Sequence, residues 1–205
     1  MNLIGLFLSF GLLMLAMSVH EFSHGWIAYR LGDSTAKEQG RLTLNPLAHI
    51  DPIGTILLPI FLYITTHGEF VFGAAKPVPI NYRALRNPKK GLLWIGLAGP
   101  LANILFACLL SLIMKFISPT TLLSAILNNL AVINIVLGVF NLIPIPPLDG
   151  SRIIIGILPE KLAKVYASIE PYGFFIIILL AAIGFLGIFI WPLVNVILAL
   201  LNVSL

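Results

Sequence analysis

Charged residues are scarce in this 205-residue chain. They make up 10% of it, whereas a soluble domain carries about 25%. So few charges could not cover a water-facing surface, which excludes an ordinary cytosolic enzyme and a disordered tail. Hydrophobic residues make up 59% and the mean hydropathy is +1.04. Together with long apolar runs, these values predict a polytopic α-helical membrane protein.

Cysteine is scarce as well, and a basic stripe is missing. The single cysteine, Cys108, lies in an apolar run, so an internal disulfide is excluded. The formal net charge is +4, but the basic residues are scattered among apolar runs, which argues against a nucleic-acid partner. The first apolar run lacks a basic segment before it, so we expect it to be retained rather than removed as a signal peptide.

The apolar runs predict an all-α bundle of about five or six transmembrane or re-entrant helices. Expected spans cover about 3–28, 91–117 and 122–145, and 53–66 is a short span or re-entrant element because Pro59 interrupts it. These elements make a core over 1–155. An amphipathic segment and one or two further spans follow over 156–205. A small β element at the membrane surface is expected from Gly40–Leu44 and 69–80.

Basic residues predict the orientation, since they are retained on the cytoplasmic side. If the first span ends on that side near Arg30, eleven of the twelve basic residues are cytoplasmic and only Lys115 lies outside. The inverted topology would place one inside and eleven outside. We therefore expect the polar residues near Arg30 to face the cytoplasm.

The motif His20-Glu21-Phe22-Ser23-His24 lies inside the first apolar run. Residues four apart share a helix face, so both imidazoles can bind one metal ion. Glu21 can then take a proton from a water bound to that metal, as a general base. The alternative is a buried polar network, because ionisable residues within a membrane helix are costly without partners.

A hydrolytic zinc site usually has three protein ligands, so a third must come from elsewhere. Asp149 follows helix-breaking prolines and lies level with the histidines, but from its position it is equally well a helix cap before Gly150. His49 and Asp51 are the rivals, although they lie outside any long span and more readily order a loop. We expect His67 and Glu69 to be solvated.

Three blocks carry a resemblance to a known family. They are the histidine motif, the segment Gly96-Leu-Ala-Gly-Pro-Leu-Ala-Asn103, and the segment Phe140-Asn-Leu-Ile-Pro-Ile-Pro-Pro-Leu-Asp-Gly-Ser-Arg152. In order, spacing and hydropathy the chain resembles the site-2 proteases from about residue 10 to 155. These are zinc metalloproteases that cleave substrates within the membrane. The resemblance is to a small prokaryotic branch without a PDZ or nucleotide-sensing domain.

The resemblance implies that His20, His24 and Asp149 hold one zinc ion and that Glu21 is catalytic. It also implies that Asn141 orients the substrate or stabilises the oxyanion, although a buried Asn commonly forms an interhelical hydrogen bond instead. We assign Asn103 to helix packing.

The function expected from these residues is hydrolysis of peptide bonds in or near the transmembrane helix of a membrane-protein substrate. The setting is a bilayer, most consistent with a prokaryotic plasma membrane, and homo-oligomerisation is left open. The alternatives are a metal transporter and a catalytically inactive zinc-binding membrane protein. Spans 91–117 and 174–205 contain no His, Asp or Glu, which argues against the transporter, and the intact Glu21 argues against the inactive protein.

Overall fold

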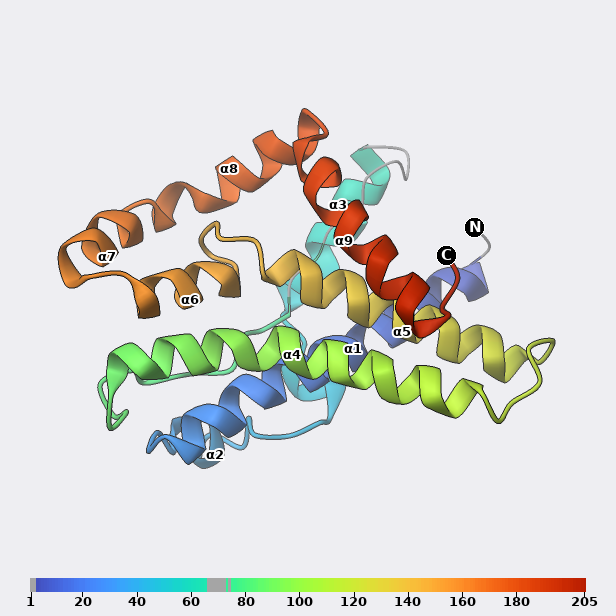
Figure 1. Cartoon of the computed structure of the whole chain (residues 1–205), viewed down its shortest axis with the longest axis horizontal. Helices are drawn as coiled ribbons and strands as arrows, with labels where there is room; N and C mark the ends of the chain where they lie inside the picture. The colour runs from blue at the N-terminus through green and yellow to red at the C-terminus, as the bar shows by residue number, and fades with distance from the viewer. Residues whose placement is uncertain (1–2, 66–72, 74) are drawn as a thin grey trace.

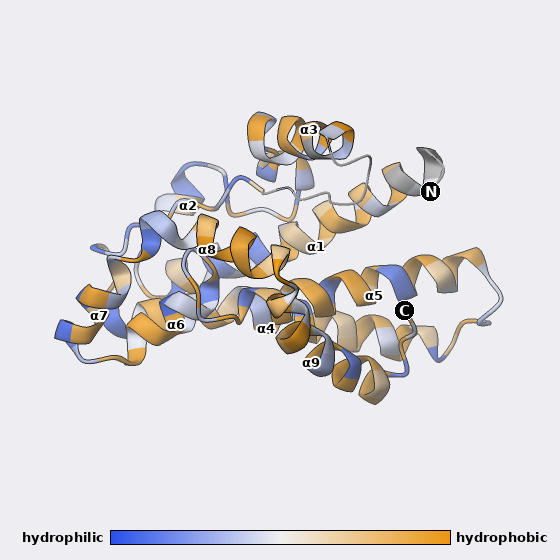
Figure 2. Ribbon diagram, turned by 90° about the horizontal axis from the view of Figure 1, so that it is seen from above, coloured by the Kyte–Doolittle hydropathy of each residue, from blue (hydrophilic) through white to orange (hydrophobic). Residues whose placement is uncertain are grey.

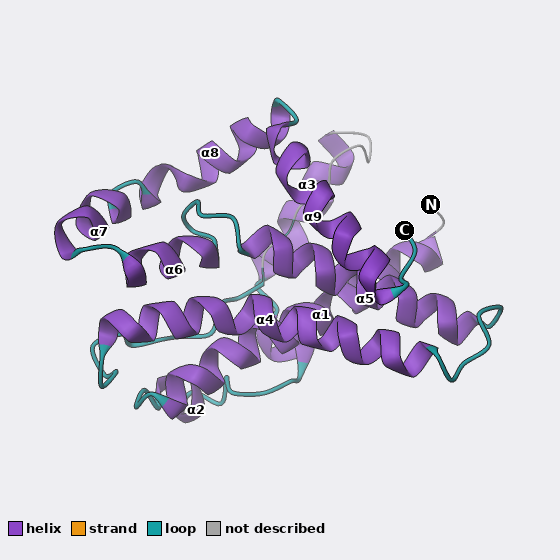
Figure 3. Cartoon of the chain, viewed as in Figure 1, coloured by secondary structure: helices purple, strands orange, loops and turns teal. Residues whose placement is uncertain are grey.

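The computed structural model describes residues 3–65, 73 and 75–205, and across them the regular structure is helical (Figure 3). Helix α1 carries the histidine motif near its C-terminal end, and a 3-10 turn and a π-helical turn precede α3. The elements, in chain order, are α1 (Leu3–Arg30), α2 (Thr35–Glu38), a 3-10 turn (Pro46–His49), a π-helical turn (Pro52–Leu57), α3 (Leu58–Thr65), α4 (Pro88–Met114), α5 (Leu122–Asn141), α6 (Asp149–Ile157), α7 (Glu160–Ala167), α8 (Glu170–Ala182) and α9 (Phe185–Leu201).

Helix α4 is the central element, because α1, α5 and α6 all pack against it (Figure 1). An apolar core fills the space between α4, α5 and α9, where Leu110, Ile135 and Val194 are buried. Gly138 lets α5 approach α4 closely, since a Cβ added there would lie 3.0 Å from the Pro100 carbonyl oxygen. Such small-residue contacts are the usual way in which helices associate in a membrane.

Two helices are long and apolar enough to cross a bilayer, namely α4 and α5. Helices α7 and α8 would make a third if they form one span bent by 62°. Helix α1, with 28 residues, coincides with the expected first span. The predicted total of five or six spans is thus not confirmed by the described residues. One reason is that the C-terminal apolar stretch is broken at Gly184.

The apolar stretch 174–205 is divided between two short helices, α8 and α9, because the chain turns at Gly184. Its φ of 72° is in the left-handed region, which interrupts a helix and favours glycine. Helix α8 has 13 residues and α9 has 17, so each is shorter than the roughly 20 that a span requires. Both helices present apolar residues on their exposed surface, as do α3 and the outer face of α4 (Figure 2).

The predicted small sheet is not found among the described residues; 69–72 and 74 lie outside them. The rest of the segment is extended, but its N–H groups bind partners other than a strand. Lys76 N–H donates to the His49 carbonyl at 2.9 Å, and Val78 N–H donates to Glu21 Oε2 at 2.7 Å. Pro77 and Pro79 have no N–H, so a regular ladder cannot form here.

The proline-rich loop between α5 and α6 is held by the C-terminal helices. The Tyr166 hydroxyl donates to the Pro144 carbonyl at 2.5 Å. Gly173 of α8 lies so close to the loop that a Cβ there would be 1.8 Å from the Pro146 carbonyl oxygen. Because α6 begins at Asp149, these contacts position that residue.

We predict that Gly173→Ala destabilises the protein, because the new methyl group would overlap the Pro146 carbonyl. The expected loss is about 1–3 kcal/mol, the usual cost of overpacking, seen as a lower thermal transition of the detergent-purified protein. Gly187→Ala is the matched control, since its Cβ would meet its nearest neighbour, on Trp191, at an ordinary 3.5 Å. Equal transitions for the two variants would contradict the contact.

Candidate metal centre

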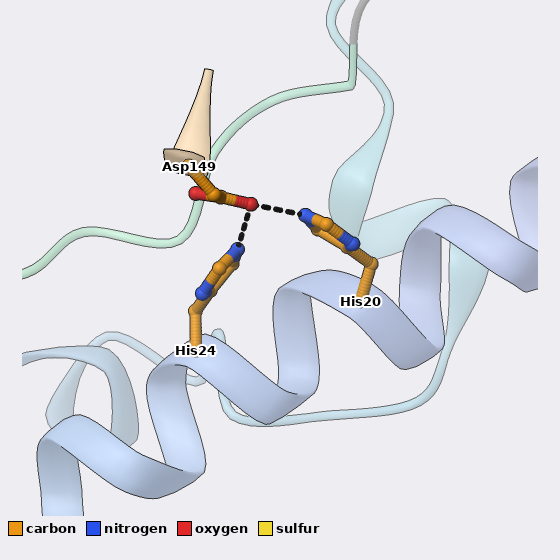
Figure 4. Close-up of side chains that lie close together, drawn as sticks. All are labelled: His20, His24 and Asp149. Carbon is orange, nitrogen blue, oxygen red and sulfur yellow. Dashed lines mark hydrogen bonds and ion pairs between the residues drawn. The ribbon is translucent and has the colours of Figure 1, made fainter. Parts of the chain in front are cut away.

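His20 and His24 lie one turn apart on α1 and point together at Asp149, the first residue of α6 (Figure 4). Asp149 Oδ2 is 2.9 Å from His20 Nε2 and 3.1 Å from His24 Nε2. All three residues are buried, and one candidate ligand atom from each lies within 4.8 Å of the other two. The histidine spacing therefore has the geometry that the sequence predicted, and Asp149 meets it from the opposite side.

Leu148, rather than Asp149, occupies the N-cap position of α6. The Asp149 carboxylate is therefore directed at the histidines instead of at the start of its own helix. Burial raises the pKa of this carboxyl, but without a metal ion, protons on the facing Nε2 atoms outweigh burial and hold the pKa below its usual value. The carboxylate is consequently in the charged form that binds metal ions.

Helix α4 approaches the two imidazoles through Gly99. A Cβ added to Gly99 would lie 2.5 Å from His20 Cε1 and 2.6 Å from His24 Nε2. Any larger residue at this position would displace the rings. The glycine therefore makes room for the imidazoles where α1 and α4 cross.

The second nitrogen of each imidazole binds an oxygen acceptor on α4. His24 Nδ1 donates to the Ile95 carbonyl at 2.7 Å. His20 Nδ1 donates to Asn103 Oδ1 at 2.6 Å. These bonds place the ring proton on Nδ1 and leave each Nε2 with a free lone pair.

Asn103 is itself fixed in orientation by neighbours on two other helices. Its Nδ2 donates to the Ala16 carbonyl at 3.1 Å and to Asn134 Oδ1 at 2.7 Å. Because a carbonyl can only accept, Nδ2 must face Ala16 and Oδ1 must face His20. Both asparagine side chains are fully buried. The network thus fixes which nitrogen of His20 carries the proton.

The donor set fits a zinc ion. Two imidazole lone pairs and one carboxylate oxygen converge on the same point, and three acceptors this close repel one another unless a cation lies between them. Two nitrogens and one oxygen in a buried site are a usual ligand set of catalytic zinc, which keeps a fourth position open. The acceptors bound to both Nδ1 atoms are the outer contacts that metal-ligating histidines typically make.

Glu21 and Asn141 line a cavity of about 220 Å³ together with the three residues above. Glu21 Oε2 accepts the Val78 N–H at 2.7 Å. Asn141 is the last residue of α5, and its Nδ2 donates to the Leu137 carbonyl at 3.0 Å. That bond lies within α5, so it is not the interhelical link considered from the sequence.

His49 and Asp51 lie outside the cluster and order a loop, as the sequence favoured. His49 Nε2 donates to the Thr43 carbonyl at 2.9 Å, and Asp51 Oδ2 accepts the Gly54 N–H at 2.6 Å. His67 and Glu69 lie outside the described residues.

Comparisons with known proteins point to one family of peptidases. A sequence profile described as peptidase family M50 matches residues 118–184, which include Asn141 and Asp149. A protein named "Putative zinc metalloprotease YwhC" from Bacillus subtilis is 35% identical over 192 residues, covering 89% of this chain and 84% of its own. The chain belongs to peptidase family M50, the site-2 protease family. It is accordingly an integral membrane protein.

Two further relatives match over less of their own length. The "Putative zinc metalloprotease Rip2" of Mycolicibacterium smegmatis is 31% identical over 82% of this chain and 63% of its own length. The "Zinc metalloprotease MJ0392" of Methanocaldococcus jannaschii is 40% identical over 74 residues, covering 36% of this chain and 22% of its own. No solved structure matches the chain.

Sequence reasoning missed the role of Asn103, which it assigned to packing alone. One signal was available: Asn103 is an amide inside an otherwise apolar span, and an amide there requires partners. What the sequence could not supply is which partner. The hydrogen bonds of the Ile95 carbonyl and the Val78 N–H could not be predicted either. Every residue has a backbone carbonyl, so the residue type does not show which one binds a given side chain.

We predict that Asn103→Ala weakens zinc binding about 10- to 100-fold, the usual effect of losing an outer hydrogen bond to a ligand histidine. Without Oδ1, the His20 ring loses the acceptor that fixes its proton and its orientation. Competition with a chelator measures the affinity. Ser111→Ala is the control, because Ser111 is a buried polar residue of the same helix that bonds to the Leu201 carbonyl. Unchanged affinity in Asn103→Ala would refute the assignment.

Proposed function

We propose that this chain hydrolyses peptide bonds in or near the transmembrane segments of other membrane proteins. Its family makes it a zinc metalloprotease, and the names of its relatives describe the same class of enzyme. The observation that carries the proposal is the convergence of His20, His24 and Asp149 beside Glu21 in one buried cavity. Zinc bound there would polarise a peptide carbonyl and make water a stronger acid.

Glu21 is the general base in this proposal. Its carboxylate takes a proton from the attacking water and later delivers it to the leaving amine. The hydrogen bond from Val78 N–H engages Oε2 and restrains the side chain beside the cavity. Such positioning matters because proton transfer requires hydrogen-bond reach.

Asn141 stabilises the oxyanion in the same proposal. One N–H of its amide is used within α5, and an amide nitrogen carries a second. That second N–H is available to negative charge that develops on the carbonyl oxygen. A donor placed for such charge in a water-poor site contributes about 3–4 kcal/mol to catalysis.

The setting we propose is a prokaryotic plasma membrane with the site open to the cytoplasm. Helix α1 would be a further span beside α4 and α5, which makes the protein multi-pass. The histidine motif lies near the α1 end that carries Arg30, and basic residues mark the cytoplasmic side.

A substrate helix must unwind before its carbonyls can react, and its backbone groups then need partners. Pairing with the extended segment 75–80 is limited, because Lys76 and Val78 N–H are engaged and Pro77 and Pro79 have none. The Lys76 and Pro77 carbonyls already accept hydrogen bonds from Arg41. A substrate strand beside this segment would therefore donate to its other carbonyls more than it would accept from its N–H groups.

We predict that Glu21→Gln keeps zinc and loses at least about a hundredfold in turnover, the usual contribution of a general base. A quenched-fluorescent library of apolar peptides in detergent measures cleavage, and elemental mass spectrometry measures zinc. Ser23→Ala is the matched control, since Ser23 lies in the same motif and its hydroxyl bonds only to the Val19 carbonyl. Turnover retained in Glu21→Gln would remove this residue from the mechanism.

A further inference from the structure

Arg152 lines the same cavity as His20, Glu21, His24 and Asp149. It follows Asp149 by three residues on α6, so both side chains lie on one face of that helix. Gly96 of α4 packs against the start of its side chain, since a Cβ at Gly96 would be 3.1 Å from Arg152 Cβ. The stem is therefore held against α4 while the residue borders the cavity.

The guanidinium of Arg152 has no hydrogen bond or ion pair with any residue that the structure describes. The neighbouring carboxylates bind other groups. Asp149 faces the two histidines, and Glu21 accepts the Val78 N–H. Asp33, close to the same region, accepts the Asn81 N–H at 2.7 Å. Arg152 is thus a half-buried cation that no carboxylate among the described side chains pairs with directly.

The phenol of Tyr82 does not supply that counter-charge. Burial raises the pKa of Tyr82, and the positive charge of Arg152 offsets only part of the rise. The hydroxyl is therefore neutral at physiological pH. It is also buried and finds no hydrogen-bond partner in the described part of the chain.

A carboxylate is the group that best satisfies such a guanidinium. It matches the planar fork with two hydrogen bonds and cancels the charge, whereas a peptide carbonyl accepts hydrogen bonds but leaves the charge unpaired. An uncompensated charge in a partly buried position is costly, so a ligand that removes it gains affinity. Because the cavity holds the proposed reacting residues, the ligand that enters it is the substrate.

We propose that Arg152 determines specificity by binding an acidic side chain of the substrate close to the peptide bond that is cut. This inference rests on the proposed function, because it concerns the substrate of that site. It assigns Arg152 to recognition and leaves proton transfer to Glu21.

Paired peptides test the proposal by binding. The probe is an apolar peptide scanned with glutamate or glutamine at each position, titrated by fluorescence anisotropy into zinc-loaded Glu21→Gln protein in neutral detergent. At one position or two, we expect the glutamate peptide to bind at least about tenfold more tightly, as for a charged hydrogen-bonded pair. Arg152→Gln should abolish the preference, and Arg152→Glu should transfer it to a lysine peptide.

Arg83→Gln is the matched control, since Arg83 is an exposed basic residue outside the cavity lining and should leave the preference unchanged. Circular dichroism establishes that the variants are folded. The proposal is overturned if no position favours glutamate, if no peptide binds, or if the preference persists in Arg152→Gln. Cleavage of the same peptides by the wild-type protein separates the two claims. Cleavage without a charge preference refutes only the role of Arg152, whereas a preference without cleavage refutes the protease.

Discussion

Three lone pairs that converge on one buried point are the constraint on which the site depends. His20 Nε2, His24 Nε2 and Asp149 Oδ2 are all acceptors once the Nδ1 protons are bound to Asn103 and Ile95. Such a group is repulsive by itself and is stabilised by a cation. The hydrogen bonds on the Nδ1 side of the two imidazoles therefore prepare the site for a metal ion.

Helix α4 brings the parts of this site together. Gly99 admits the imidazoles of α1, Gly96 admits α6 with Asp149 and Arg152, and Gly138 of α5 packs onto Pro100. Because lipid offers helices no hydrophobic drive to associate, such close contacts and buried amide bonds hold them instead. Asn103 contributes to both tasks, since it links three helices and orients a proposed ligand.

Local spacing predicted part of the site, and tertiary contacts supplied the rest. The histidines could be predicted because their separation equals one helical turn. Asp149 could not be chosen over a helix cap from position alone, since that choice depends on how the proline-rich loop turns; the family resemblance favoured it. Asn103 was interpreted as packing because a sequence does not show which groups an amide meets.

The fold followed the hydropathy where apolar runs were uninterrupted, as in α4 and α5. Elsewhere single residues determined where a helix ends or a strand cannot form. Gly184 divides the C-terminal apolar stretch between two short helices. Pro77 and Pro79, whose lack of N–H groups was visible in the sequence, leave segment 75–80 extended and without a strand partner among the described residues.

The zinc content of the detergent-purified protein tests the central claim most directly. Elemental mass spectrometry of wild type, His24→Ala, Asp149→Ala and the control Asp51→Ala is the measurement. We predict about one zinc per chain in wild type and in Asp51→Ala, with most of it lost from the other two. Wild type without zinc, or Asp149→Ala with its full content, would contradict the three-residue site.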